Sequence, residues 1–386
     1  MAENKDKKVL NVPNLRFPEF EGEWEEHYLS DYLDFKNGLN PKPERFGKGI
    51  KFISVMDILN NAVITNDCIR ASVDVSEEEL LSFCVENGDI LFQRSSETLE
   101  DVGRANVYMD NKPAVFGGFV IRGKKKAEYD PLFFRYLLAS PFARKKIIPM
   151  GAGAQHFNIG QEGLNKVKLH FALLDEQKKI ARLLSLLDER IATQNKIIDK
   201  LQSLIKGIAQ HWIKNITSRS IYVKLGDICQ ITTGKLDANA QVANGIYPFF
   251  TCAEHPFKID SFAFDTEALL ISGNGANLGY INYYNGKFNA YQRTYVLDLF
   301  SENIQYIKWV LKVLLPKRIA IEKSSSNTPY ILLSTLSDLM LPIPSKENQY
   351  HIAKLMQSLE RKLSSQITLN GSYNILKQYL LRQMFI

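Results

Sequence analysis

The chain repeats itself, and this repeat limits the fold to a duplicated plan. Residues 163–213 align with residues 335–385 at a constant offset of 172, so that Leu164 falls on Leu336. Apolar residues fall on apolar residues along 51 aligned positions without a gap. Self-similarity of this length predicts a structural unit that is present twice.

The starts of the two halves also match, at a different offset. Leu29-Ser30-Asp31 aligns with Leu225-Gly226-Asp227 at an offset of 196, and Val102-Gly103 aligns with Leu278-Gly279 at 176. The second half is therefore shorter, because its variable stretch has fewer residues. The repeat unit is a variable globular module followed by a well-matched helix.

Each predicted helix carries a heptad pattern of apolar residues. Steps of four and three residues join Ile180, Leu184, Leu187, Ile191, Gln194, Ile198, Leu201, Ile205, Ile208 and Trp212. In the second copy the same positions are Ile352, Met356, Leu359, Leu363, Gln366 and Asn370, with a less regular end at Leu380 and Met384. The pattern predicts coiled-coil helices of roughly 57 Å, at 1.5 Å for each of about 38 residues. Because a whole domain separates them in sequence, we expect an antiparallel pair, with Gln194 and Gln366 setting the register.

The modules between the helices have the pattern of mixed α/β domains. Short runs rich in Val, Ile and Phe predict strands at Lys51–Met56, Asp89–Gln93, Asn106–Tyr108 and Ala114–Ile121, and at Leu269–Ser272, Tyr280–Tyr284 and Thr294–Leu299. Apolar residues at helical spacing predict helices at Pro131–Ile148 and Asn303–Ile321.

The composition favours a globular protein and is compatible with a polyanionic partner. Hydrophobic residues make up 45% of the chain, the net charge is +6 and the pI is about 8.9. We expect a cytoplasmic protein without membrane contact, since neither a signal peptide nor a spanning apolar run is visible. The scattered Cys68, Cys84, Cys229 and Cys252 lack the spacing of a zinc site and predict reduced, buried thiols.

Two short motifs resemble catalytic or nucleotide-binding sequences but depart from them. Asn327-Thr328-Pro329-Tyr330 is similar to the Asn-Pro-Pro-Tyr of amino-methyltransferases, yet no glycine loop for a methyl donor accompanies it. Gly273-Asn274-Gly275 and Gly279 have the wrong spacing for a dinucleotide loop. We interpret the first as a loop before a strand and the second as a hairpin.

Several motifs, in this order, resemble the specificity subunits of type I restriction–modification systems. They are Pro13–Phe20 followed by Trp24, Gly88–Phe92, the Gln155–Ile159 loop, and Leu174-Asp175-Glu176-Gln177 at the start of the heptads. With the duplicated layout, the resemblance covers nearly the whole chain. The second copy departs from the pattern, with Lys346-Glu347-Asn348-Gln349 and Glu267-Ala268-Leu269-Leu270 at the equivalent places.

The resemblance implies α/β (α+β) target-recognition modules, duplicated with pseudo-two-fold symmetry and separated by two long antiparallel coiled-coil helices. The implied domains are residues 1–172 (first target-recognition domain), 173–215 (first spacer helix), 216–344 (second target-recognition domain) and 345–386 (second spacer helix). Each module would read half of a bipartite site in double-stranded DNA, and the helices would set the spacer and dock two modification subunits.

The same resemblance implies a non-catalytic chain that binds no cofactor itself. S-adenosylmethionine would be used by the modification subunits, and Mg²⁺ with ATP by restriction subunits where these join. Half-sites on one face of the duplex lie about one turn, roughly 34 Å, apart, a distance that a rigid helical pair can fix.

Polar and basic loop residues are the candidates for DNA contacts, because Arg and Lys recognise guanine or phosphate and Asn and Gln recognise adenine. In the first module these are Lys42, Arg94, Ser95, Arg104, Gln155 and His156. In the second they are Lys235, Asn274, Asn277, Gln292, Arg293, Ser326 and Asn327. Two other functions stay open at this point: a self-contained DNA methyltransferase or nuclease fusion, and a coiled-coil adaptor without DNA binding.

Overall fold

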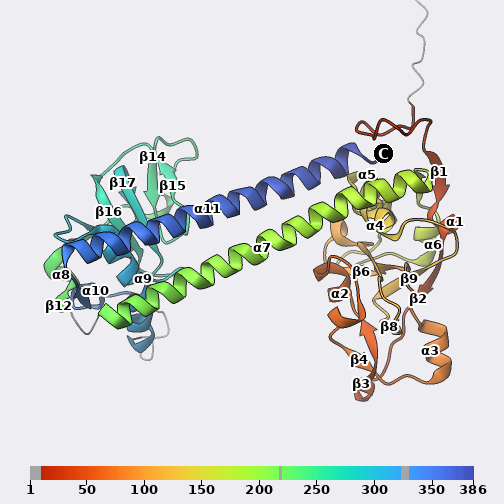
Figure 1. The fold of residues 1–386 in the computed structure, drawn as a ribbon, viewed down its shortest axis with the longest axis horizontal. Coiled ribbons are helices and arrows are strands. Elements are labelled where there is room, and N and C mark those ends of the chain that lie inside the picture. Colours follow the sequence, from red (N-terminus) through yellow and green to blue (C-terminus); the bar gives the residue numbers. More distant parts are fainter. Residues whose placement is uncertain (1–9, 217–219, 323–329) are drawn as a thin grey trace, which may run out of the picture. The chain divides into compact units, whose positions relative to one another are not determined.

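A computed structural model describes residues 10–216, 220–322 and 330–386 of the chain (Figure 1). Both globular modules and both predicted long helices are present in the described part. Among these residues, no helix is long and apolar enough to cross a membrane.

Contacts divide the chain into two compact units. Unit 1 holds Met1–Asn195 together with Leu369–Ile386, and unit 2 holds Lys196–Thr368. The long helices are α7 (Leu174–Ile216) and α11 (Lys346–Gln383), and each contributes one segment to each unit. Every unit therefore consists of one module and two helical segments.

The module of unit 1 contains two main sheets. Its strands are β1 (Glu25–Tyr28), β2 (Leu33–Asn37), β3 (Phe46–Ile53), β4 (Ser72–Val73), β5 (Ile90–Gln93), β6 (Ser95–Ser96), β7 (Ala105–Val107), β8 (Ala114–Phe116), β9 (Val120–Lys125), β10 (Phe157–Asn158) and β11 (Lys168–Phe171). One sheet has the order β2–β9–β5–β7 and the other β4–β3–β8, in which β3 and β8 run parallel. The pairs β1–β11 and β6–β10 complete the module.

Short helices cover these sheets. They are α1 (Leu29–Tyr32), α2 (Val55–Asn60), α3 (Glu77–Phe83), α4 (Pro131–Ala139), α5 (Pro141–Ile147) and α6 (Gln161–Asn165), with 3-10 turns η1 (Pro43–Arg45), η2 (Asn66–Cys68), η3 (Leu99–Asp101) and η4 (Ile148–Met150). The predicted strands at Asp89–Gln93 and Asn106–Tyr108 are confirmed as β5 and β7, with ends that shift by one residue.

The strand predicted at Lys51–Met56 is wrong in its second half. The strand β3 ends at Ile53, and α2 begins two residues later. The backbone N–H and the hydroxyl of Ser54 both donate to Oδ2 of Asp57 at 2.7 Å, which caps the new helix. This local hydrogen bonding outweighs the β-propensity of the run.

Two further predictions join elements that the structure separates. The strand predicted at Ala114–Ile121 is divided into β8 and β9 by a turn at Gly117-Gly118. The helix predicted at Pro131–Ile148 is divided into α4 and α5, because Pro141 lacks a backbone N–H and can only start a helix.

The module of unit 2 contains one six-stranded sheet. Its elements are β12 (Ile221–Lys224), α8 (Leu225–Ile228), β13 (Gln230–Thr233), η5 (Ala238–Ala240), β14 (Tyr247–Phe250), β15 (Phe257–Ile259), β16 (Phe264–Ser272), β17 (Ile281–Ala290), β18 (Thr294–Asp298), α9 (Ile304–Glu322), α10 (Leu333–Ser337) and β19 (Met340–Ile343). The sheet order is β13–β18–β16–β17–β14–β15, and β12 pairs with β19. The three strands and the helix predicted for this module are confirmed as β16, β17, β18 and α9. Tyr280 lies before β17, Leu299 beyond β18 and Asn303 before α9.

The two modules share one topology, which confirms the duplication. The order β13–β18–β16 repeats β2–β9–β5, and the long β17 takes the place of both β7 and β8. The parallel pair β14–β17 repeats the parallel pair β3–β8, and β12–β19 repeats β1–β11. The fold is therefore a duplicated α/β module with a long helix after each copy.

The core of unit 1 includes the end of the chain. Trp24, Phe133 of α4 and Phe385 form an aromatic cluster with ring centroids 5.6 to 6.2 Å apart. Arg16 holds the start of α7, because its guanidinium donates twice to the buried carboxylate of Glu176 at 2.8 and 2.7 Å. The motif Pro13–Phe20 thus fixes the N-terminal segment to the helix.

The helices pair within each unit. In unit 1 Asp188 contacts Lys377 at 2.5 Å and Asn195 accepts from Asn370 at 2.8 Å, so the two helices run antiparallel. In unit 2 the fully buried Met356 packs with Ile205 of α7. The predicted antiparallel coiled coil is confirmed in both units.

Candidate nucleic-acid interface

Three loops of the first module meet at the turn between β8 and β9. This turn, Gly117–Val120, is called turn A, and the Val120 N–H donates to the Gly117 carbonyl at 2.8 Å. Arg94, which follows β5, donates its N–H to the Phe119 carbonyl at 2.9 Å and its Nη1 to the Gly118 carbonyl at 3.2 Å. Leu39 forms a parallel bridge with Gly117, which brings the segment after β2 to the same place.

A fourth segment joins this end through β10. Asn158 pairs with Ser95 in the two-stranded ladder β6–β10, and their side chains are hydrogen-bonded. Ile159 donates its N–H to the Arg94 carbonyl at 2.9 Å. Gln155 and His156 directly precede β10 and are both exposed. The loop predicted at Gln155–Ile159 is therefore partly a short strand.

Five of the six predicted contact residues of this module lie in these converging segments. Lys42, Gln155 and His156 are exposed, and Arg94 and Ser95 are half-buried. Lys42 follows Pro41, which lines the same groove as Ser95 and Phe119. The structure gathers these residues at one end of the module, and their role in DNA contact stays a prediction.

Arg104 has a different environment. Its guanidinium contacts the carboxylate of Asp101 at 2.6 Å, and it lies near Arg144 of α5. Burial and the positive charge of Arg104 lower the pKa of Arg144 to about 10, so Arg144 remains charged at neutral pH. Because Asp101 neutralises part of this charge, Arg104 is less suited than Arg94 to bind a phosphate.

The second module forms the same kind of end around the turn Tyr291–Thr294, called turn B. The Thr294 N–H donates to the Tyr291 carbonyl at 2.8 Å, and the Gly273 N–H donates to the Arg293 carbonyl at 2.8 Å. A pocket of about 250 Å³ opens here, lined by Thr233, Gly273, Gln292, Arg293, Tyr295 and Ile331.

The predicted contact residues of the second module surround turn B. Lys235, Asn277, Gln292 and Arg293 are exposed, and Asn274 is half-buried. Asn277 donates its Nδ2 to the Cys252 carbonyl at 3.1 Å, which holds the Gly273–Gly279 hairpin against the neighbouring loop. The hairpin interpretation is confirmed, since this segment joins the antiparallel strands β16 and β17.

Two predicted contact residues, Ser326 and Asn327, lie outside the described residues, as do Thr328 and Pro329 of the methyltransferase-like motif. Tyr330 is described and forms a bridge with Asn274. This bridge repeats the pairing of Asn158 with Ser95 in the first module.

The sequence does not identify Phe119 as a candidate contact residue. In the structure, Phe119 occupies the place in turn A that Arg293 occupies in turn B. Only polar and basic loop residues are candidates for DNA contact on chemical grounds, and Phe119 is neither. An alignment of β9 with β18, at an offset of 174, would have identified it, because Val120 then falls on Thr294.

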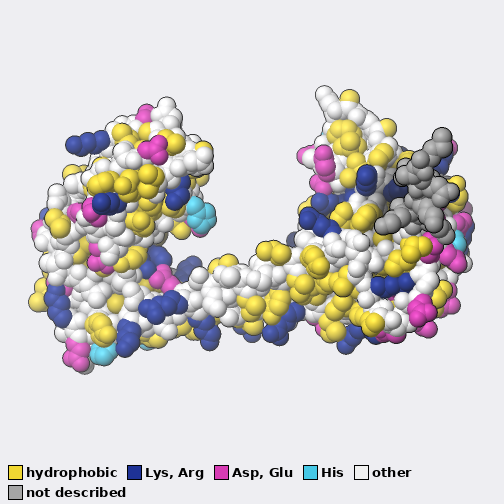
Figure 2. Space-filling view, turned by 90° about the horizontal axis from the view of Figure 1, so that it is seen from above, with side chains coloured by type: hydrophobic (Ala, Val, Ile, Leu, Met, Phe, Trp, Pro, Cys, Tyr) yellow, Lys and Arg dark blue, Asp and Glu magenta, His cyan; other side chains and the backbone are white. Residues whose placement is uncertain are grey.

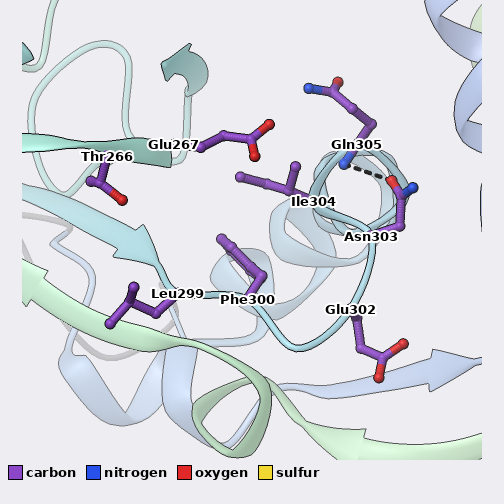
Figure 3. A pocket seen from close by; sticks show the side chains of 8 residues that line it. All are labelled: Thr266, Glu267, Leu299, Phe300, Glu302, Asn303, Ile304 and Gln305. Carbon is purple, nitrogen blue, oxygen red and sulfur yellow. Dashed lines mark hydrogen bonds between the residues drawn. The ribbon is translucent and has the colours of Figure 1, made fainter. Parts of the chain in front are cut away.

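Another pocket of unit 2 does not suit nucleic acid. It has a volume of about 510 Å³ and is lined by Thr266, Glu267, Leu299, Phe300, Glu302, Asn303, Ile304 and Gln305 (Figure 3). Two of these eight residues carry carboxylates, and none is Lys or Arg, so the lining offers no cation to a phosphate. Glu267 accepts from the Tyr283 hydroxyl at 2.6 Å, and Asn303 caps the start of α9.

The four cysteines are free thiols and are partly rather than fully buried. Burial raises the pKa of the Cys229 thiol to about 12 and also raises that of Cys84. Over the described ranges, no three His, Cys, Asp or Glu side chains form a group that could hold a metal ion.

Comparison with known proteins supports the duplicated plan. The model of the family described as "Type I restriction modification DNA specificity domain" matches residues 21–203 and again residues 220–370. The Type I restriction enzyme EcoDI specificity subunit of Escherichia coli is 42% identical over 143 residues, which is 37% of this chain and 32% of that relative. A putative type I restriction enzyme MjaX specificity subunit of Methanocaldococcus jannaschii is 27% identical over 206 residues, 52% of this chain and 48% of the relative.

The matches with these two relatives thus span half or less of the relatives' own length. The fold has a solved counterpart over nearly its whole length. The crystal structure of a type I restriction–modification system S subunit from M. genitalium covers 97% of this chain and 99% of its own, with a TM-score of 0.66 and 19% sequence identity. Since the family model matches both modules and most of both helices, the chain belongs to the type I restriction modification DNA specificity family, whose domain it carries twice.

Proposed function

We propose that this chain is the sequence-specificity subunit of a type I restriction–modification enzyme. Each module reads one half of a bipartite site in double-stranded DNA, and the chain itself catalyses no reaction. The observation that carries this proposal is the pair of turns A and B. One backbone frame is built twice and presents different side chains, Gly118-Phe119 in the first module and Gln292-Arg293 in the second.

This arrangement suits the recognition of two different short sequences. A fixed frame positions the side chains, and the side chains that reach the base edges determine which bases are accepted. Lys42 and Arg94 in the first module, and Lys235 and Arg293 in the second, supply positive charge for the phosphate backbone or for guanine. The net charge of +6 has the sign that binding to polyanionic DNA requires.

The long helices carry the same apolar patch twice. Ile197 and Leu204 of α7 are 39% and 51% exposed, and their repeat equivalents Leu369 and Leu376 of α11 are 36% and 44% exposed. Residues seven apart lie on one face of a helix. Figure 2 shows hydrophobic side chains interspersed with Lys and Arg side chains along the helices. Two equivalent patches suit two copies of one partner, and we assign them to two modification subunits.

The reactions belong to the partners in this proposal. Modification subunits use S-adenosylmethionine to methylate adenine, and restriction subunits, where they join, use ATP and Mg²⁺ to cleave DNA. The place of action is the cytoplasm, where these partners meet DNA.

Sequencing of methylated adenines in a host with and without this gene tests the proposal. The expected result is a bipartite motif, with a fixed unread spacer, that is methylated only when the gene is present. The purified chain with its modification subunits should bind that motif. Methyl transfer by the chain alone would instead identify an enzyme, and a complex that binds no defined sequence would identify an adaptor.

A further inference from the structure

Turns A and B hold equivalent residues at their third position. Besides the hydrogen bond that closes each turn, the Gly117 N–H donates to the Ile53 carbonyl at 3.0 Å and the Tyr291 N–H donates to the Phe250 carbonyl at 2.9 Å. The carbonyl of the third residue accepts from Arg94 in turn A and from Gly273 in turn B. Phe119 therefore corresponds to Arg293.

Phe119 is held outward on a rigid backbone. Its side chain is 68% exposed, whereas every other residue of Ala114–Gly123 is buried. The turn is closely packed, because a Cβ on Gly117 would lie 2.8 Å from the Phe52 ring and a Cβ on Gly118 would overlap the side chain of Asn40. A large apolar side chain is thus presented to solvent with little freedom in its backbone.

The surroundings of Phe119 are apolar, whereas those of Arg293 are polar. A groove of about 450 Å³ beside Phe119 is lined by Leu39, Asn40, Pro41, Phe46, Phe52, Ser54, Val55, Met56, Ser95, Gly117, Gly118, Phe119 and Val120. Phe46 and Met56 are 41% and 60% exposed. Single exposed apolar residues are common on proteins, but here several share one end of the module with the cationic Arg94.

Among the base edges of the major groove, only thymine offers a methyl group, and apolar side chains such as Phe recognise it by contact. Arg recognises guanine instead, through two hydrogen bonds. We propose that Phe119 is a specificity-determining residue of the first module, which reads the 5-methyl group of a thymine at the place where Arg293 reads a base in the second module. This inference rests on the proposed function and adds the residue and the base feature to it.

Replacement of thymine by uracil tests the inference, because it removes only the methyl group. The complex of the full chain with its modification subunits is titrated with duplexes that carry the bipartite target, in which each thymine of one half-site is changed singly to uracil. At one position the wild-type complex should bind the uracil duplex about fourfold more weakly than the thymine duplex, because one buried methyl-sized group is lost. Phe119→Ala should bind the thymine duplex more weakly and should not distinguish it from the uracil duplex.

Matched variants locate the effect. Phe142→Ala removes an exposed Phe from α5, 40% exposed, and should leave the difference between thymine and uracil unchanged. Arg293→Ala should relax the other half-site only, which identifies the half-site that each module reads. Phe119→Leu keeps an apolar contact and should retain part of the discrimination.

Three outcomes would overturn the inference while leaving the proposed function intact. They are a wild-type complex that tolerates uracil at every position of the half-site, a Phe119→Ala complex that still distinguishes thymine from uracil, and an equal loss of affinity by Phe119→Ala on every duplex. The last result would indicate that the Phe119 side chain inserts between neighbouring base pairs without reading a methyl group. A wild-type complex that binds no bipartite sequence would overturn the proposed function itself.

Discussion

Gln177 and Gln349 perform the same structural task in the two halves of the chain. Gln177 is 3% exposed; its Oε1 accepts from the Asp130 N–H at 3.0 Å and its Nε2 donates to the Ala172 carbonyl at 2.8 Å. Gln349 is fully buried and repeats both bonds, with the Asn303 N–H and the Pro344 carbonyl, each at 3.0 Å. Each amide thus joins the start of a long helix to the N-cap residue of a module helix.

We expect Gln177→Ala and Gln349→Ala to lower the free energy of unfolding by about 1–3 kcal/mol each, because in each case a backbone N–H and a carbonyl that are at least half-buried lose their partner. Urea unfolding followed by circular dichroism measures the change. Gln378→Ala, which truncates an exposed glutamine of α11, serves as the control and should stay within about 0.5 kcal/mol of wild type. Equal stability of Gln177→Ala and Gln378→Ala would show that the buried bridge contributes nothing.

At the scale of elements, glycines have opposite roles in the helices and in the loops. Gly207 of α7 and Gly371 of α11 have no neighbouring atom within 4 Å of the place that a Cβ would take, so a methyl group meets open space. Gly38 and Gly234 lie where a segment crosses turn A or turn B, and a Cβ there would overlap the carbonyl oxygen of Gly117 or Ala290. The loop glycines therefore allow these segments to approach the turns closely, which a side chain would prevent.

Gly207→Ala and Gly371→Ala should each stabilise the protein by roughly 0.5–1 kcal/mol, because alanine loses less conformational entropy in a helix. Gly38→Ala should destabilise it, since the segment after β2 must move away from turn A. Thermal unfolding measures the change in each variant: Tm should rise for Gly207→Ala and Gly371→Ala and fall for Gly38→Ala. A lower Tm for Gly207→Ala would mean that a methyl group on this side of α7 meets a neighbour after all.

The elements also show why some features follow from the sequence and others do not. The heptad seam predicts α7 and α11 because long-period repetition of apolar residues is a local signal. Turn A has a weaker signal: the Gly117-Gly118 pair, which is typical of a turn, interrupts an otherwise apolar run at Ala114–Ile121. The pairing of the two strands with β2, β3 and β5 determines where each strand ends. Phe119 could not be predicted as an exposed residue, because its exposure depends on that pairing.

At the scale of the whole molecule, the division between the two units falls inside both long helices, after Asn195 in α7 and after Thr368 in α11. A helix is stiff and rises by 1.5 Å per residue, whereas a flexible linker of similar length would sample many separations. We therefore propose that the paired helices fix the separation of the two half-sites and so the number of unread bases between them.

Insertion of one heptad into each helix tests whether the paired helices fix this separation. Placed beside the contacting residues Asn195 and Asn370, the insertions keep the apolar seam in register and lengthen each helix by about 10.5 Å. Since base pairs are 3.4 Å apart, the unread spacer should grow by at most about three base pairs while both half-sites stay the same. Methylome sequencing of the host reads the new motif, and insertion into α7 alone should instead destabilise the protein, because the seam loses its register. A new half-site sequence with the old spacer would contradict this proposal, because the modules and not the helices would then determine the separation of the half-sites.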